Sequence, residues 1–271
     1  MSGDSDRWLV APGTPFSLAD RDPRDTTGAP GDKKATNKAL EDLALRLEEL
    51  QDRLYAESRQ SLLVVLQAMD AGGKDGTVKH VFRGVNPQGV RVTSFKEPTP
   101  LEAAHDFLWR VHANAPQRGE IGIFNRSHYE DVLIVRVDEL VPESVWRRRY
   151  RHINHFEWLL HDADMRVIKL YLHISREEQA DRLQARLDDP AKRWKFEAGD
   201  LRKREQWDDY IAAYEEAIQR TSVEHAPWYV VPADRKWFRN WAISRIVIET
   251  LEDMDPGYPE PAEDLDGITV A

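Results

Sequence analysis

The segment Ala68–Thr77, AMDAGGKDGT, combines two aspartates, three glycines and a lysine. A glycine-rich turn exposes backbone N–H groups, and a helix that begins at a lysine adds positive charge, so such a segment can bind a phosphate. It departs from the usual pattern GxxxxGK[ST], because Ala68 replaces the first glycine and Asp75 replaces the Ser or Thr. A plain strand-to-helix turn is the alternative. The candidate phosphate-binding residues here are Gly72, Gly73, Lys74, Gly76 and Thr77.

Asp70 lies inside this candidate phosphate site. A carboxylate would repel a phosphate unless a divalent cation lay between them, so Asp70 is a candidate Mg²⁺ ligand. Aspartates in turns also hydrogen-bond their own backbone, which is the structural alternative. Asp75 is interpreted as mostly structural, because the helix dipole favours an acid in the first turn.

Short apolar runs and helical repeats alternate along the chain. Leu62–Leu66 predicts a strand buried on both faces, and the spacing after Lys74 predicts a helix. Further strands are predicted at Val90–Phe95, Glu120–Phe124, Arg166–Ile174 and Pro227–Val231. Further helices are predicted at Thr36–Ser58, Leu101–Ala113, Pro142–His161, Arg176–Leu187, Leu201–Arg220 and Arg235–Met254. The alternation predicts an α/β fold in which helices cover both faces of a five-stranded parallel sheet.

Polar and charged residues directly follow three of the predicted strands. They are Asp70 and Lys74 after the first, Lys96 after the second, and Asn125 and Arg126 after the third. Open parallel sheets bind their ligands beyond the carboxyl ends of the strands. This edge of the sheet is therefore the predicted ligand site.

Arg126 and Glu130 come after the third predicted strand. An arginine there can clamp a phosphate, and Asn125 or Glu130 can hold Mg²⁺ or its water. The alternative is a helical Arg–Glu pair four residues apart, worth about 0.2–0.5 kcal/mol. The strand-end position favours the functional interpretation. His128, beside a tyrosine, is interpreted as a packing residue.

The segment from Arg182 through Arg186 to Lys192 and Lys195 is basic and interrupts the helical pattern. It can form a mobile lid that brings cations to a transferring phosphate and excludes water. A solvated loop is the alternative. Linker-like composition occurs only at the chain ends, which predicts one domain. Its expected parts are an irregular N-terminal segment (1–35), a domain (36–255) with a lid near 182–200, and an acidic tail (256–271).

Arginines are frequent on the predicted helix Pro142–His161, at Arg147, Arg148, Arg149 and Arg151. They can form a solvated face or one wall of a channel for a long anion, and the residues leave both interpretations open. A phosphate polymer needs such a basic track because of its dense negative charge. Other cations that can extend the track are Lys79, Arg83 and Arg136.

The chain has 271 residues and a formal net charge of −10. Glu249–Ala271 holds eight acids and no base, whereas residues 56–248 hold 30 bases and 29 acids. The acidity therefore says little about the candidate site. The lack of cysteine excludes a disulfide framework and a thiol nucleophile, and it fits a cytoplasmic location. No signal peptide is expected, and the apolar runs are too short to predict a membrane partner.

Six stretches of the sequence resemble the polyphosphate kinase 2 family. They are AMDAGGKDGT (68–77), GVNPQGVRVTSFK (84–96), HDFLWR (105–110), FNRSHYEDVL (124–133), LQARLDDPAKRWKF (183–196) and APWYVVPADRKW (226–237). The resemblance implies a P-loop kinase fold with a helical lid, related to thymidylate kinase. It implies that Asp70 and Lys74 belong to the Walker A loop and Asn125 and Arg126 to the Walker B position, with the lid at 182–195.

The resemblance also implies an activity. Family members move phosphate between inorganic polyphosphate and nucleotides with Mg²⁺, so we expect a cytoplasmic polyphosphate:AMP/ADP phosphotransferase that uses Mg²⁺, or alternatively Mn²⁺. The implied ligands are polyphosphate, AMP, ADP, ATP and guanine nucleotides. A homo-oligomer (dimer or tetramer) is expected, and binding of nucleic acid is not. Lys96, Asp106 and Arg110 are expected to face the acceptor nucleotide. An ATP-dependent nucleoside monophosphate kinase and a non-catalytic polyphosphate-binding or nucleotide-binding protein are the alternatives.

The Walker B position distinguishes subclasses of this family. Many members have Asp-Arg-Ser-Trp-Tyr-Asn there, whereas this chain has NRSHYE at residues 125–130. It thus resembles the one-domain subclass that phosphorylates both nucleoside monophosphates and diphosphates. The acid of the first position moves to Glu130, which keeps the negative charge around the metal similar. The expected metal ligands are Asp70, Asn125 and Glu130.

Overall fold

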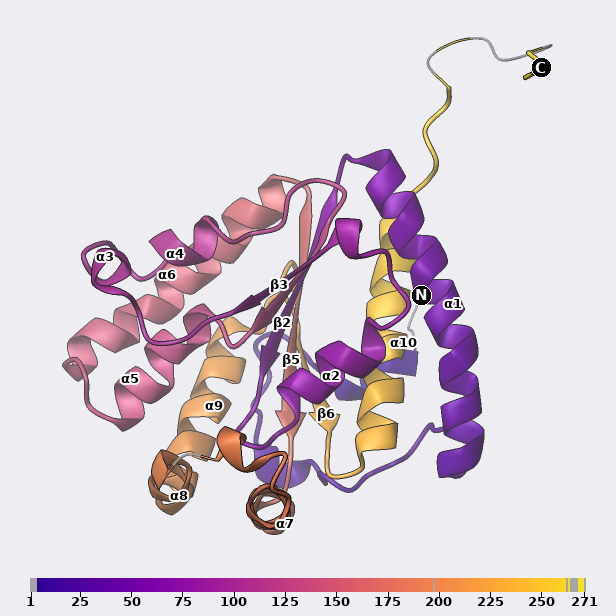
Figure 1. The fold of residues 1–271 in the computed structure, drawn as a ribbon. Helices are drawn as coiled ribbons and strands as arrows, with labels where there is room; N and C mark the ends of the chain where they lie inside the picture. The colour runs from indigo at the N-terminus through magenta and orange to yellow at the C-terminus, as the bar shows by residue number, and fades with distance from the viewer. Residues whose placement is uncertain (1–3, 197, 262, 264–267, 271) are drawn as a thin grey trace.

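The computed structural model describes residues 4–196, 198–261, 263 and 268–270. Its centre is a six-stranded sheet in the order β1-β6-β5-β2-β4-β3 (Figure 1). The strands are β1 Leu9–Val10, β2 Ser61–Gln67, β3 Val90–Ser94, β4 Ile121–Asn125, β5 Met165–His173 and β6 Trp228–Pro232. Strands β2 to β6 run parallel, which confirms the five predicted parallel strands.

Strand β1 corrects the predicted five-stranded sheet. It pairs antiparallel with β6 and lies in the segment that was expected to be irregular. Two residues carry no detectable strand pattern, so the pairing could not be predicted. The N-terminal segment is held on the domain by buried apolar side chains. Trp8 and Val10 are 3% and 2% exposed, and Trp8 packs edge-on against Phe238 and Trp241.

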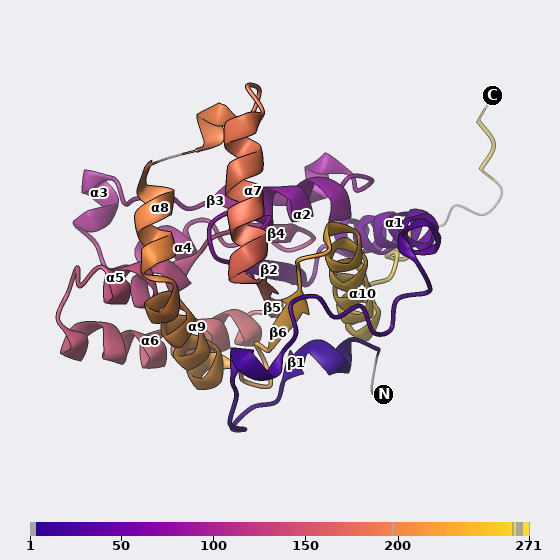
Figure 2. The same cartoon turned by 90° about the horizontal axis from the view of Figure 1, so that it is seen from below.

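Helices cover both faces of the sheet, as the predicted three-layer arrangement requires (Figures 1 and 2). One layer contains α1 Lys33–Glu57, α2 Lys74–Val81 and α10 Lys236–Met254. The other contains α5 Ile134–Val137, α6 Glu143–Asp162 and α9 Trp207–Thr221. Helices α7 Arg176–Asp188 and α8 Ala198–Glu205 extend beyond the carboxyl ends of the parallel strands. Within the described ranges, no helix has both the length and the apolar character that a membrane span requires.

Two predicted helices are each divided in the structure. The helix predicted at Leu101–Ala113 is replaced by α3 Pro100–Ala103 and α4 Trp109–His112. Between them the Asp106 side chain accepts a hydrogen bond from the Leu108 backbone N–H at 3.0 Å. Such local bonds compete with helical ones and favour turns. The helix predicted at Leu201–Arg220 is likewise divided into α8 and α9.

The register of the parallel strands brings the predicted site residues to one edge. Strand β2 is buried along its whole length and lies between β5 and β4. Leu66 of β2 and Ser94 of β3 both pair with Asn125 of β4. The three strands therefore end at the same level, and the loops that follow them meet there.

A buried ionic network fixes the segment that follows β4. Glu157 of α6 contacts Lys169 of β5 at 2.5 Å, and both side chains are fully buried. The Tyr129 hydroxyl donates to Glu157 at 2.9 Å, and His128 Nε2 lies 3.1 Å from the same oxygen. Burial raises the pKa of Glu157, but Lys169 and His128 hold it below its ordinary value. His128 is thus a core residue, and the network anchors the backbone between Arg126 and Glu130.

Replacing Glu157 with glutamine is expected to lower the free energy of unfolding by about 3–5 kcal/mol, because Lys169 would stay buried without its charged partner. Urea denaturation measures this change. The exposed Glu143 of α6 provides the matched control, since Glu143→Gln should change stability by no more than about 0.5 kcal/mol. Equal stability of the two variants would contradict a structural role for the network.

Candidate active site

The loop between β2 and α2 has the geometry of a phosphate cradle. Ala71 and Gly73 both adopt left-handed backbone angles, with φ of 61° and 103°. Gly73 also needs to lack a side chain, because a Cβ there would lie 2.0 Å from Nη1 of Arg239. Lys74 opens α2 and donates its ammonium to the Ala68 carbonyl at 2.8 Å, which folds the side chain back over the loop. The positive end of α2 therefore faces the space that a phosphate would occupy.

Arg182 of α7 holds this loop in place. Its Nη1 donates to the carbonyls of Ala71 and Gly72 at 3.1 and 2.9 Å, and its Nη2 donates to those of Ala233 and Asp234. Its Nε donates to Glu178. These bonds use the five N–H groups of the guanidinium. Arg182 is among the predicted phosphate ligands, whereas in the structure its guanidinium binds the loop carbonyls and braces the loop.

Asp70 is surrounded by cations. Its carboxylate lies 3.0 Å from Nη2 of Arg126 and 3.3 Å from Nζ of Lys203. Burial raises the pKa of Asp70, but Lys74, Lys203 and Arg126 hold it below its ordinary value, so the group stays ionised. Arg126 itself has a left-handed backbone angle, with φ of 62°. Such strain in a non-glycine residue persists only where the surrounding structure imposes it, and it is concentrated at functional sites.

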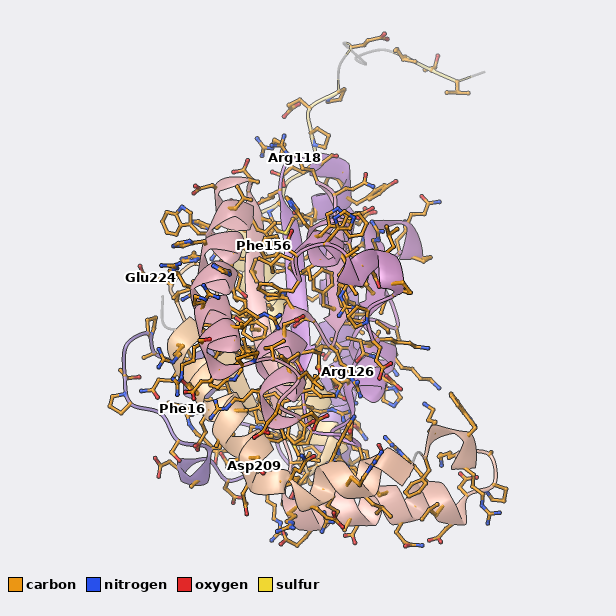
Figure 3. The ribbon with its side chains drawn as sticks, turned by 90° about the vertical axis from the view of Figure 1, so that its left-hand side faces the viewer. Phe16, Arg118, Arg126, Phe156, Asp209 and Glu224 are labelled. Carbon is orange, nitrogen blue, oxygen red and sulfur yellow. The ribbon has the colours of Figure 1, made fainter. Side chains whose placement is uncertain are left out.

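A small open cavity lies beside this cluster. Asp70, Arg126 and Lys203 line it together with Glu130, Tyr210 and Tyr214. Two carboxylates and two cations therefore meet at the carboxyl edge of the sheet. Figure 3 shows Arg126 in the lower part of the molecule, near the α7 and α8 helices that extend below it.

Asn125 belongs to a different contact group from Asp70. Its amide donates to Oδ1 of Asp75 at 2.8 Å, and Oδ2 of Asp75 lies 3.4 Å from Nζ of Lys195. Asp75 was interpreted as mostly structural, yet it joins the end of β4 to the lid. Asn125, predicted as a metal ligand together with Asp70 and Glu130, thus has Asp75 as its side-chain partner in the structure.

The predicted lid consists of α7, the short 3₁₀ helix η5 Arg193–Lys195, and α8 (Figure 2). Lys195 reaches Asp75, whereas Lys192 pairs with Asp189 and Arg186 lies 3.6 Å from Asp200, both within the lid. Lys203 of α8, just beyond the predicted lid boundary, makes the contact with Asp70. Two lysines of this segment therefore contact acids of the phosphate loop and of the first turn of α2.

Replacing Lys203 with glutamine is expected to lower kcat about 10- to 100-fold without changing the melting temperature by more than a few degrees. The physical reason is that a preorganised cation would be lost where charge develops on the transferring group. The neighbouring Arg202 on the exposed side of α8 provides the control, since Arg202→Gln should keep full turnover. Equal kcat values for the two variants would remove Lys203 from the site.

The residues expected to face the acceptor nucleotide lie around α4. Arg110 is buried, donates to the Lys96 carbonyl at 2.8 Å and lies 5.4 Å from the Phe95 ring centroid. The Lys96 side chain is exposed. Asp106 lines an open groove with Leu108, Trp109, His112, Ala113 and Phe156. Arg110 therefore supports the β3–α3 connection, and of the three residues only Asp106 lines this groove.

Two of the four arginines on α6 are paired with carboxylates, whereas Arg148 and Arg151 are exposed and have no acid within 4.0 Å among the described residues. Arg147 pairs with Glu143 and Glu216, and Arg149 pairs with Asp131 at 2.9 Å. Arg136, a predicted polyphosphate ligand on α5, also contacts Glu216, at 2.7 Å. These carboxylates favour the solvated-face interpretation over a channel wall. Lys79 on α2 and Arg83 just after this helix differ, because both are exposed and no acid lies within 4.0 Å of them among the described residues.

Taken together, a parallel sheet, a glycine-rich loop that ends in a helix-opening lysine, and carboxylates and cations at the strand ends define a P-loop kinase. Comparison with known proteins supplies the family. The model of the family described as "Polyphosphate kinase 2 (PPK2)" matches residues 31–259, and the chain belongs to this family. The resemblance seen in the sequence is confirmed.

Individual relatives agree with the family assignment. The chain is 57% identical over 255 residues to the AMP/ADP-polyphosphate phosphotransferase of Meiothermus ruber, covering 94% of this chain and 96% of the relative. It is 49% identical to the ADP-polyphosphate phosphotransferase of Rhodopseudomonas palustris, covering 79% of this chain and 78% of the relative. The crystal structure of polyphosphate kinase 2 from Arthrobacter aurescens TC1 matches with a TM-score of 0.93 and 43% identity, covering 97% and 94% of the two chains.

Proposed function

We propose that this enzyme transfers phosphoryl groups between inorganic polyphosphate and nucleoside monophosphates and diphosphates, converting AMP to ADP and ADP to ATP reversibly. The observation that carries the proposal is the Asp70–Arg126–Lys203 cluster beside the Lys74 loop, in a chain of this family. Relatives that share most of their length with this chain are named as AMP/ADP-polyphosphate and ADP-polyphosphate phosphotransferases.

The residues of the cluster fit a Mg²⁺ ion. Asp70 and Glu130 line the same cavity, and Mg²⁺ is usually held by one or two carboxylates together with substrate phosphates and water. No cluster of three or more acids, histidines or cysteines that could cage a metal occurs in the part of the chain that the structure describes. We therefore propose Asp70 and Glu130 as the ligands, with Mn²⁺ as an alternative ion. When bound, Mg²⁺ would neutralise charge on the phosphates.

The protein's own residues position and stabilise the transferring group. The backbone N–H groups of the loop and the Lys74 ammonium bind the end of the polyphosphate chain. An oxygen of the acceptor's terminal phosphate forms a bond to the terminal phosphorus, while the bond to the bridging oxygen breaks and that oxygen leaves with the shortened chain. Arg126 and Lys203 approach this phosphorus from the cavity and stabilise its charge. The chemistry needs little beyond positioning and electrostatics.

Both AMP and ADP are proposed as phosphoryl acceptors. Glu130 in place of the more common asparagine supports use of both AMP and ADP. Incubation of the enzyme with polyphosphate, Mg²⁺ and either nucleotide, followed by ion-exchange separation, tests this. We expect ADP and then ATP from AMP, and ATP from ADP. Product from ADP alone would place the chain with the diphosphate-specific enzymes and remove Glu130 as the subclass marker.

The proposal includes a homo-oligomer (dimer or tetramer), a cytoplasmic location and the use of guanine nucleotides. Size-exclusion chromatography with light scattering measures the first. Parallel assays with GMP and GDP measure the last.

A further inference from the structure

Arg239 is a buried cation without a charged partner. It lies in the first turns of α10 and is 2% exposed. Its Nε and Nη2 groups both donate to the side-chain amide oxygen of Asn240, at 3.2 and 2.7 Å. Among the described residues, no carboxylate lies within 4.0 Å of its guanidinium. Burying a charge without a counter-ion costs desolvation free energy, so the rest of the fold must offset this cost at Arg239.

The guanidinium of Arg239 lies directly against the phosphate loop. A Cβ at Gly73 would be 2.0 Å from Nη1, and a Cβ at Gly76 would be 3.4 Å from Nη2. In the described part of the chain Nη1 has no hydrogen-bond acceptor. The free donor therefore adjoins the turn from which α2 begins, where the helix dipole adds further positive potential.

Other cations gather around Arg239. Burial and the charge of Arg182 lower the pKa of Arg239 to about 10. Burial and the charges of Arg182 and Arg239 lower the pKa of the exposed Lys236, and burial and the charges of Arg239, Lys79 and Arg83 lower that of His80.

Arg239 adjoins Gly73 and Gly76 at the start of α2, and Lys236 lies three residues before it on α10, so these cations form a basic group that runs from α10 to α2. The acid that faces it is Glu178, which raises the pKa of Lys236 but already bonds Arg182 at 2.7 Å. The positive charge of this group therefore exceeds the negative charge beside it. On α6, by comparison, Arg147 and Arg149 are neutralised by carboxylates.

We propose that Arg239 and Lys236 bind the part of the polyphosphate donor that extends beyond the phosphate loop, so that the donor chain passes over the start of α10 and of α2 instead of over α6. The inference rests on the proposed function and adds the course of the donor. The Lys74 ammonium and the backbone N–H groups of the loop would be enough to neutralise the charge of a single bound phosphate. The further cations match a ligand whose negative charge repeats along its length, and Lys79 and Arg83 continue the same surface.

Kinetics with donors of two lengths test this inference. Lys236→Gln is expected to raise the KM for long-chain polyphosphate about tenfold, the usual loss for one charge-assisted hydrogen bond, with kcat and the KM for AMP unchanged. The effect on tripolyphosphate should be smaller, because a short donor ends before Lys236. Arg239→Lys should raise the KM for both donors, since it lies at the loop. Arg148→Gln on α6 is the matched control, because Arg148 is exposed and donates to the Ser144 carbonyl, and it should match the wild type.

Direct binding of long-chain polyphosphate without nucleotide separates this inference from the proposed function. Weaker binding by Lys236→Gln, with a shallower dependence of affinity on salt, supports the donor path even if turnover is absent. Wild-type affinity and KM in Lys236→Gln would overturn it whether or not Arg239→Lys folds. A loss caused instead by Arg148→Gln would move the donor to α6. Failure of the wild type to use polyphosphate as a donor would refute only the proposed function.

Discussion

Replacing Asp70 with asparagine is expected to lower kcat about 100- to 1,000-fold while changing the KM for AMP by no more than a few-fold. Asp70 is the acid at the centre of the cation cluster and the proposed ligand of Mg²⁺. Loss of one metal ligand removes several kcal/mol of charge stabilisation from the transition state, and each 1.36 kcal/mol corresponds to about a factor of ten in rate. Steady-state kinetics at saturating polyphosphate and varied Mg²⁺ measure the change.

Asp75→Asn is the matched control for Asp70→Asn. Asp75 lies five residues away, is more exposed, and contacts Asn125 and Lys195. We expect about a tenfold loss or less, because the variant loses a solvent-exposed contact with the lid. An additional result distinguishes the two acids, since only Asp70→Asn should require more Mg²⁺ for half-maximal rate. Equal kcat values for Asp70→Asn and the wild type would remove Asp70 from the metal site.

Replacing Lys74 with methionine is expected to lower kcat/KM for polyphosphate about 1,000-fold. The ammonium is the cation built into the loop itself, and methionine keeps the length of the side chain but not its charge. The binding of AMP measured by calorimetry should be almost unchanged, because the predicted acceptor site lies near α4. Strong loss of AMP binding would contradict the assignment of the loop to the donor.

The same lysine predicts how activity depends on pH. Burial and the charge of Arg126 lower the pKa of Lys74 to about 8. In the free enzyme the ammonium is therefore lost as pH rises through about 8, and kcat/KM for polyphosphate should fall above that value. The pH profile of kcat/KM, compared with that of Lys74→Arg, measures this step. An arginine stays charged, so kcat/KM of the Lys74→Arg variant should not fall near pH 8, even if its overall activity is lower.

The sequence predicted the parallel sheet well, and it marked the edge of the sheet where the candidate site lies, because both depend on local patterns. Apolar runs defined the five parallel strands to within about one residue, and the charged residues after β2, β3 and β4 marked the edge where the site lies. The unpredicted strand β1 and the divided α3–α4 segment depend instead on packing and on a single side-chain hydrogen bond.

Several residues of the site could not be found from the sequence. Lys203 and Arg239 lie more than 130 residues after the loop that they contact. Neither belongs to a local pattern, and only the packing of α8 and α10 brings them to Asp70 and Gly73. Arg182 was recognised as basic, but its bonds to backbone carbonyls give it a supporting position that charge alone does not reveal.

Transfer of label from polyphosphate to nucleotides decides whether polyphosphate is the phosphoryl donor. The purified enzyme would be incubated with ³²P-labelled long-chain polyphosphate, unlabelled AMP and Mg²⁺, with Asp70→Asn in parallel. We expect label first in ADP and then in ATP, with at least a hundredfold slower labelling by the variant. Unlabelled nucleotides in this assay, together with labelling of ADP from γ-³²P-ATP and AMP, would contradict it and identify an ATP-dependent nucleoside monophosphate kinase.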